Sequence, residues 1–499
     1  MTTRRQLLLS TLLCPAFPAF AGAFAPPGAA PYPSQPGTTG LALRYGPPPG
    51  PDARARLAYW TDLALSTIAI DHTPPPAGPS PYAEQRGRTR TSRVMAIFHI
   101  AIHDALNAIV QRYPGYSASL PALADSSFDA AIAQAGHDAL VELYQRQRSR
   151  LDALLQQDLA RLPDDRAKLN GIDIGRRAAR AILGLRTNDG SEIPDPVVGH
   201  NYPESTAPGI WRPDPISGNR VALGAYWKLV KPFVLPSVHA FRAPPPPALG
   251  SAAYASAFNE VKRLGGNGTG TPTQRTAEQT VIGTYWGYDD AAWLGTPLRM
   301  YNQMVLQIHL LRISDPLELA RALALVNAAQ ADATITLWES KYYYLFWRPV
   351  HGVREASPGS GPTGAGDGNP ATAGDPAWTP LGAQASNLVG PDFTPAFPSY
   401  PSGHAGVGSA LFQTLRRMYG DKVPFTFVSD EYNGITRDND GTVRPYLPRS
   451  YASLSQAEEE AGQSRIYLGV HWQFDKTAGI SCGRRVADYI YQRGLVRPA

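Results

Sequence analysis

The chain of 499 residues has few cysteines and little charge. Of its two cysteines, Cys14 and Cys482, the first falls in a predicted leader, so a single cysteine would remain and no internal disulfide could form. Charged residues occupy 17% of positions and form no Lys/Arg run or basic-aromatic stripe, which argues against nucleic-acid binding. Stability must come from packing, and 43% hydrophobic residues suffice for one large or two medium domains.

Long uninterrupted apolar runs are also missing. The longest run after the leader, residues 94–110, contains four polar residues: His99, His103, Asp104 and Asn107. Because a membrane-spanning helix needs about 20 predominantly apolar residues, we expect none here. We therefore expect neither a membrane nor nucleic acid among the partners, and the oligomeric state stays open.

The first residues have the pattern of an export signal. Arg4 and Arg5 precede an apolar stretch that starts at Leu7, and small residues suited to cleavage lie between positions 21 and 25. Paired arginines are typical of the twin-arginine route. We expect residues 1–23 to be removed and the protein to be exported, either to the periplasm or out of the cell.

The rest of the sequence is dominated by helical periodicity. Apolar residues recur at three- and four-residue spacings in these ranges: 54–70, 92–109, 127–162, 164–185, 252–264, 273–288, 296–313, 316–346, 403–419 and 454–493. Few segments alternate with period two, so the sequence predicts an all-α fold with long Pro/Gly-rich connections. We expect a flexible lead-in (24–52), an N-terminal helical bundle (53–247) and a C-terminal helical bundle (248–499).

The last third of the chain carries three groups of residues suited to binding an oxyanion. They are Lys341 with Arg348-Pro349, then Pro401-Ser402-Gly403-His404, then Ser464-Arg465 with His471 and Asp475. Together they supply three cations, two imidazoles and a turn that starts a helix, which is what holding a tetrahedral oxyanion requires. The predicted ion is phosphate or an ion of the same shape, such as vanadate.

The first group lies at the end of a predicted helix. Lys341 and Arg348 are seven residues apart, so in one continuous helix they would share a face about 10 Å apart along its axis. Pro349 would then end that helix. A basic pair alone would indicate a solvated face, but aromatic residues at positions 342–344, 346 and 347 surround this one.

The second group starts a predicted helix. The backbone N–H groups of its first turn can bind an anion, the helix dipole favours negative charge, and Gly403 allows close approach. Ser402 could instead serve only as an N-cap. His404, two residues later, could donate or accept a proton of the same anion.

The third group contains a histidine with a carboxylate four residues later. Asp475 can take the Nδ1 proton of His471 and leave Nε2 unprotonated, as in a nucleophile or a metal ligand. Arg465 and His471 are six residues apart and cannot share one helical face. We therefore expect the chain to turn near Gly469.

These three groups resemble the signature of the acid phosphatase and vanadium haloperoxidase superfamily. Further segments are similar to fungal-type vanadium-dependent chloroperoxidases: residues 285–289, 295–297, 301–303, 338–354, 397–404 and 464–475. The resemblance implies an all-α fold of two four-helix bundles with the active site at one end of the second.

The resemblance also implies roles for the matched residues. His471 would bind vanadium, and the equatorial oxygens of vanadate would be held by Lys341, Arg348, Ser402, Gly403 and Arg465. His404 would act as the acid–base group, and Lys341 would also polarise bound peroxide. Asp475 would orient His471, and Asp289 would orient an arginine. Trp338 and Phe397 would line the halide pocket.

The implied activity is that of a vanadium-dependent haloperoxidase, which uses hydrogen peroxide to oxidise chloride or bromide to hypohalous acid, with a small organic acceptor possible. Phe397 favours chloride, whereas His351 and Asp290 depart from the fungal pattern, so the halide preference stays open. Phosphate can occupy the same site, and an exported acid phosphatase that forms a phosphohistidine at His471 is the alternative. A non-catalytic oxyanion-binding protein is a third possibility, opposed by the presence of both His404 and His471.

Overall fold

The structure is a computed structural model that describes residues 43–73, 83–117, 120–121 and 125–498. The predicted leader (1–23) and most of the predicted lead-in lie outside these residues. Thirteen α-helices and a two-stranded sheet make up the described part, which confirms the mainly helical class. The helices are α1 Ala53–Asp71, α2 Gly87–Val110, α3 Phe128–Leu143, α4 Arg148–Leu159, α5 Arg166–Leu185, α6 Ala252–Leu264, α7 Ala277–Tyr285, α8 Pro297–Leu310, α9 Pro316–Tyr344, α10 Pro349–Glu355, α11 Gly403–Tyr419, α12 Leu454–Tyr467 and α13 Gln473–Arg493.

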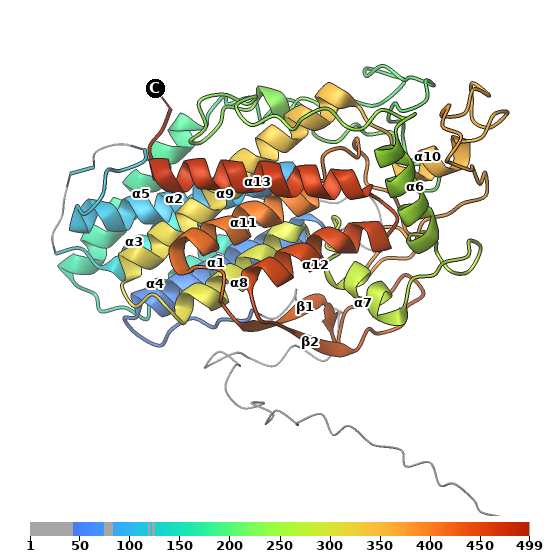
Figure 1. Cartoon of the computed structure of the whole chain (residues 1–499). Coiled ribbons are helices and arrows are strands. Elements are labelled where there is room, and N and C mark those ends of the chain that lie inside the picture. The colour runs from blue at the N-terminus through green and yellow to red at the C-terminus, as the bar shows by residue number, and fades with distance from the viewer. Residues whose placement is uncertain (1–42, 74–82, 118–119, 122–124, 499) are drawn as a thin grey trace, which may run out of the picture.

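Helix α9 lies at the centre of the molecule, between α2 and the pair α11 and α13. Its side chains are buried almost without interruption from Leu317 to Tyr342, since it packs against α2 on one side and against α11 and α13 on the other. One apolar core continues through these helices from α1 to α13. In Figure 1, α6, α7 and α10 lie at one end of the molecule and α3 and α4 at the other.

The start of α9 shows how local sequence fixes the helix ends. Asp315 is the N-cap, and its carboxylate accepts hydrogen bonds from the backbone N–H groups of Leu317 and Glu318. Pro316 follows at the first helical position, where its missing N–H costs nothing. Ser402 caps α11 in the same way through Ala405 N.

Two predicted helices end earlier than expected. The range 127–162 breaks at Tyr144, whose φ of −131° and ψ of 64° are not helical, and continues as α4. Helix α9 ends at Tyr344 because Leu345 is left-handed, with φ 51°. Arg348 is instead the N-cap of α10, and Pro349 is its first residue. The prediction that Lys341 and Arg348 share one helical face is therefore wrong, and Pro349 starts a helix rather than ending one.

The sequence did not predict the β-hairpin. Strand β1 (Phe425–Asn433) pairs antiparallel with β2 (Tyr446–Tyr451), with Phe425 opposite Tyr451. The second half of β1 buries three consecutive polar residues, Ser429, Asp430 and Glu431. These buried polar residues hide the alternation of apolar and polar positions that normally reveals a strand.

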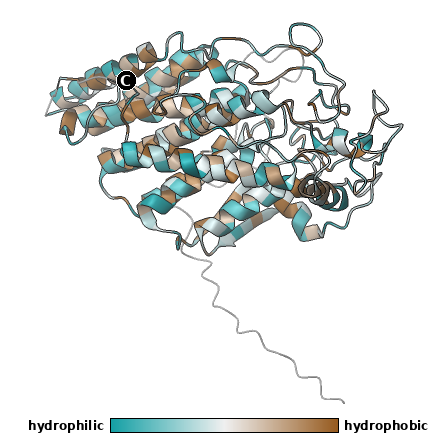
Figure 2. Cartoon of the chain, turned by 45° about the horizontal axis from the view of Figure 1, so that its top comes forward, coloured by the Kyte–Doolittle hydropathy of each residue, from teal (hydrophilic) through white to brown (hydrophobic). Residues whose placement is uncertain are grey.

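Helix α2 is the one helix in the described ranges that is long and apolar enough to cross a membrane. Within the structure 89% of its most apolar window is buried, as in the core helix of a folded protein. Figure 2 shows hydrophobic and hydrophilic residues side by side on the helices. This mixture fits elements that pack on one side and face water on the other.

Candidate anion-binding site

The three groups predicted from the sequence meet in one buried region. Lys341 lies in the last turn of α9, Arg348 at the start of α10, His404 in the first turn of α11 and Arg465 in the last turn of α12. His471 lies in the link between α12 and α13. Each of these side chains is at most 2% exposed. We call the set of Lys341, Arg348, His404, Arg465 and His471 the cationic cup.

The link between α12 and α13 turns as the sequence predicted. Gly469 has φ 71°, a conformation that side chains with a Cβ rarely adopt. A Cβ at this position would also lie 2.5 Å from the carbonyl oxygen of Gly265. The turn lets Arg465 and His471 reach the cup from the ends of two different helices.

His471 is held in one orientation by two neighbours. Its Nδ1 lies 2.8 Å from Asp475 Oδ2, and its Nε2 lies 3.1 Å from Nη1 of Arg348. Arg348 is itself fixed, since its Nε donates to Phe397 O at 2.9 Å and its Nη1 donates to Val470 O at 2.7 Å. The geometry fits a neutral imidazole that donates from Nδ1 to Asp475 and presents an electron pair at Nε2.

Lys341 is oriented by the loop that precedes α11. Its Nζ donates to three carbonyl oxygens, those of Pro398 at 2.8 Å, Ser399 at 2.9 Å and Pro401 at 2.6 Å. The Lys341 ammonium therefore holds the loop that precedes Ser402 in place, and its charge forms part of the cup. A contact between Lys341 and an anion would require one of these hydrogen bonds to be exchanged.

Asp289 lies between two guanidinium groups. Its Oδ2 accepts from Arg465 Nη2 at 2.5 Å, and its Oδ1 accepts from Nη2 of Arg88. Burial opposes ionisation of Asp289, but Arg465 and Arg88 outweigh it and hold its pKa below the usual value. The sequence pointed to a carboxylate beside an arginine here, but it gave no sign of Arg88.

Arg88 lies in the first turn of α2 and is 201 residues from Asp289 in the chain. A charged residue at the start of an apolar helix is the one signal that could have drawn attention to it. No periodicity or spacing predicts a contact at such a separation. Arg88 is 3% exposed, so the fold places a further buried cation beside the cup.

Several buried nitrogens of the cup have no hydrogen-bond partner among the residues that the structure describes. They are Arg348 Nη2, Arg465 Nε and Nη1, and both ring nitrogens of His404. Buried donors without acceptors are rare in native proteins and call for an explanation. An oxyanion with four oxygens would supply the missing acceptors, so this donor set fits a phosphate-like or vanadate-like ion.

The pKa values of the cup residues also favour a bound anion. Burial, followed by the charges of neighbouring cations, lowers the pKa of Lys341 well below its usual value. Burial is likewise the main cause that lowers the pKa of Arg348 to about 9. The pKa values of His404 and His471 fall well below the usual range, first through burial and then through nearby arginines. Both imidazoles are thus neutral near pH 7, and an anion would relieve the repulsion among the cations.

An aromatic wall closes one side of the cup. Trp338 and Phe397, each at most 2% exposed, lie with ring centroids 5.0 Å apart. Trp338 Nε1 donates to Leu223 O at 3.0 Å. A Cβ on Gly403 would lie 2.8 Å from the Trp338 ring, so glycine is needed where α11 meets this wall. The side of the cup that contains Phe397 is therefore buried and lined by aromatic rings.

His351, which departs from the fungal pattern, lies on α10 and is 6% exposed. Burial, aided by the charges of Arg212 and Arg354, lowers its pKa to about 3. His351 is thus a neutral imidazole near pH 7. Its Nδ1 has no partner in the described part of the chain.

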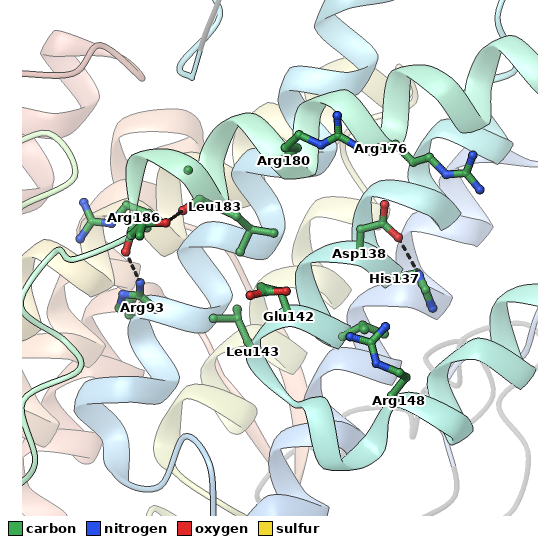
Figure 3. A pocket seen from close by; sticks show the side chains of 13 residues that line it. Arg93, His137, Asp138, Glu142, Leu143, Arg148, Arg176, Arg180, Leu183 and Arg186 are labelled. Atoms are coloured by element: carbon green, nitrogen blue, oxygen red, sulfur yellow. Dashed lines mark hydrogen bonds and ion pairs between the residues drawn. The ribbon is translucent and has the colours of Figure 1, made fainter.

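A surface cleft elsewhere in the molecule is also rich in arginine. It has a volume of about 630 Å³ and lies between α3 and α5, close to the starts of α2 and α4. In Figure 3, Arg176 and Arg180 lie across the cleft from Arg148, with Asp138 and His137 between Arg176 and Arg148. All three arginines are exposed, whereas those of the cup are buried. None of the residues predicted to form the site lines this cleft.

The C-terminal region of the chain is similar in sequence to known proteins. Residues 321–495 match the family model described as the VCPO second helical-bundle domain. Over 291 residues, or 51% of this chain, the sequence is 35% identical to vanadium chloroperoxidase from Curvularia inaequalis, and the match spans 46% of that protein, less than half its length.

Two solved structures share the fold of this chain. The crystal structure of a bacterial vanadium-dependent iodoperoxidase has a TM-score of 0.68 at 22% identity, covering 88% of this chain and 96% of that one. An apo-type bacterial vanadium-dependent chloroperoxidase has a TM-score of 0.61 at 17% identity, covering 82% of this chain and 95% of that one.

Proposed function

We propose that the protein is a vanadium-dependent haloperoxidase, in keeping with the match of residues 321–495 to the VCPO second helical-bundle domain. It would use hydrogen peroxide to oxidise chloride or bromide to hypohalous acid. The observation that carries the proposal is the set of buried cup nitrogens that have no acceptor among the described residues. This set lies beside an imidazole whose Nε2 electron pair faces the same region.

The residues of the cup fit vanadate. His471 would bind it through Nε2, and Arg348, Arg465 and the first turn of α11 would bind its oxygens. Vanadate, when bound, supplies the centre at which hydrogen peroxide is activated toward halide. Asp475 keeps the proton of His471 on Nδ1, so that Nε2 stays unprotonated, and binding of vanadate at Nε2 would replace its contact with Arg348 Nη1.

His404 is placed to move a proton. Its ring is buried beside Arg465, Asp289 and Arg88, and its low pKa keeps it neutral at the pH of most assays. A neutral imidazole can accept a proton from hydrogen peroxide as it enters the cup. Tyr301 fixes the backbone at this point, since its hydroxyl donates to His404 O at 3.0 Å.

The aromatic wall favours halide oxidation over ester hydrolysis. The same cations and His471 could support phosphoryl transfer, so charge alone does not separate the two reactions. Phosphate esters need space for a polar leaving group. Trp338 and Phe397 instead form a buried apolar surface, which suits a weakly hydrated halide.

The test compares the two reactions on one preparation. Protein supplied with vanadate, hydrogen peroxide and chloride, bromide or iodide is assayed with monochlorodimedone, and vanadate-free protein is assayed with p-nitrophenyl phosphate. We expect vanadate-dependent halogenation and little ester hydrolysis. Brisk hydrolysis without halogenation by any halide would replace the proposal with the phosphatase alternative.

Two variants check that turnover takes place at the cup. His404→Ala should abolish most halogenation while vanadate still binds, whereas His471→Ala should remove vanadate binding itself. A protein that only binds oxyanions would show no turnover before either change. Equilibrium dialysis against vanadate measures the binding in each variant.

A further inference from the structure

Arg88 brings a charge from the N-terminal half of the chain to the boundary between the cup and the aromatic wall. Its Cζ lies 5.2 Å from the centroid of the Phe397 ring. The same ring lies 4.8 Å from Arg348 Cζ and 5.1 Å from Lys341 Nζ. Phe397 is therefore in contact with three cations, and Arg88 is the one that α2 contributes.

The ion pair with Asp289 does not belong to Arg88 alone. Asp289 is shared between Arg88 and Arg465, and the nearby Asp290 also stabilises the charge of Arg88. The positive charge at the aromatic wall therefore comes from Arg88 together with Lys341 and Arg348, which contact the same Phe397 ring. A buried group of cations attracts a small anion more strongly than an exposed one, because solvent screens it less.

One donor of Arg88 remains without an acceptor. Its Nε is buried and has no partner among the described residues, although the side chain is 3% exposed. Arg348, Arg465 and His404 already offer five such nitrogens for the oxygens of an oxyanion. The Arg88 donor is additional to these and belongs to a guanidinium that packs against Phe397.

The geometry points to Arg88 as a specificity-determining residue that binds the halide next to Phe397; this inference rests on the proposed function. A guanidinium is more weakly hydrated than an ammonium, so it pairs well with large, weakly hydrated anions. The halide would lie beside the Arg88 N–H groups at the edge of the aromatic wall, close to where it is oxidised. Bromide and iodide should gain more from this contact than chloride, which holds its water more tightly.

The first test is kinetic. Arg88→Gln should raise the KM for bromide roughly tenfold or more, as loss of a charge-assisted hydrogen bond would, while kcat and the vanadate dissociation constant change less than about threefold. Arg88→Lys should have a bromide KM between those of the wild type and Arg88→Gln, because it keeps the positive charge. Arg93→Gln is the matched control, since Arg93 lies on the same helix, is 7% exposed and pairs with Asp189 at 2.8 Å.

The second test does not depend on turnover. Bromide binding is followed by the broadening of the ⁸¹Br NMR line, with and without vanadate, in the wild type, Arg88→Gln, Arg88→Lys and Arg93→Gln. We expect a saturable broadening that Arg88→Gln removes and Arg93→Gln preserves. Arg88→Lys, which keeps the ion pair with Asp289, serves as the decisive variant if Arg88→Gln does not fold.

Specific outcomes would overturn the inference. An unchanged bromide KM and unchanged broadening in Arg88→Gln would remove Arg88 from halide binding. A weaker vanadate affinity with normal bromide binding would make it a positioning residue that acts through Asp289. Wild-type protein that binds bromide through Arg88 but never halogenates would instead leave this inference standing and contradict the proposed function.

Discussion

The cationic cup and the surface cleft of Figure 3 both gather arginines, but they do so in different ways. In the cleft, Arg176 and Arg180 are four residues apart on one face of α5, and they reach into water. In the cup, Arg348 and Arg465 come from different helices and are fully buried, with N–H groups that have no acceptor in the described residues. The two regions therefore differ in burial and in donors without acceptors rather than in the number of arginines, and this difference is why we propose the cup, not the cleft, as the anion-binding site.

The largest expected effect is the loss of stability on removing the charge of Asp289, the carboxylate that pairs with Arg88 and Arg465. Asp289→Asn leaves Arg88 and Arg465 buried without a counter-charge, which should cost about 3–5 kcal/mol of the free energy of unfolding. Asp138→Asn at the cleft, where the side chain is 28% exposed, should cost less than about 1 kcal/mol. Urea denaturation of both variants makes the comparison, and equal losses would contradict it.

The second effect is on activity. Arg465→Gln removes donors from the anion and should lower kcat/KM for halogenation by about 10²–10³-fold, as loss of one preorganised donor does. Arg180→Gln in the cleft should leave kcat/KM unchanged. A similar loss in both variants would mean that the cleft takes part in the reaction.

The third effect is a dependence of stability on pH that arises in the core. Burial, with a smaller contribution from His309, lowers the pKa of His99 from 6.5 to about 3. Between those pH values the unfolded chain binds a proton that the folded protein does not, so stability falls as the pH is lowered. His99→Leu should reduce this loss by up to about 1.4 kcal/mol per pH unit. Denaturation at pH 7, 6 and 5 measures the slope, and an unchanged slope would rule out His99 as a cause.

The smallest effect is expected in the cleft. Its arginines Arg148, Arg176 and Arg180 are exposed, so replacing each with Gln should change the unfolding free energy by less than about 0.5 kcal/mol. Vanadate binding should be unchanged in the triple variant. A weaker affinity, measured by equilibrium dialysis, would show that the cleft competes with the cup for the anion.

The sequence predicted those parts of the site that lie in short motifs. The four-residue spacing of His471 and Asp475 predicted their contact, and the six-residue spacing of Arg465 and His471 predicted the turn at Gly469; the structure confirms both. Helices α6 and α11 have the predicted bounds, because caps and periodicity agree at both ends. Local signals of this kind depend on residues within one or two turns of each other.

Other features depend on tertiary contacts that no local pattern encodes. The left-handed Leu345 ends α9, and Arg348 then reaches the cup from α10 rather than from the face that holds Lys341. Lys341 itself is held by three carbonyls of the loop before α11. Arg88 meets Asp289, 201 residues away in the chain, because the start of α2 lies against the segment between α7 and α8.

The most direct test of the central claim is a crystal structure of the protein soaked with vanadate. The account predicts vanadium bonded to His471 Nε2, with its oxygens within hydrogen-bond distance of Arg348, Arg465 and the first turn of α11. Vanadate bound instead among Arg148, Arg176 and Arg180 of the surface cleft, with the cup unchanged, would contradict the account.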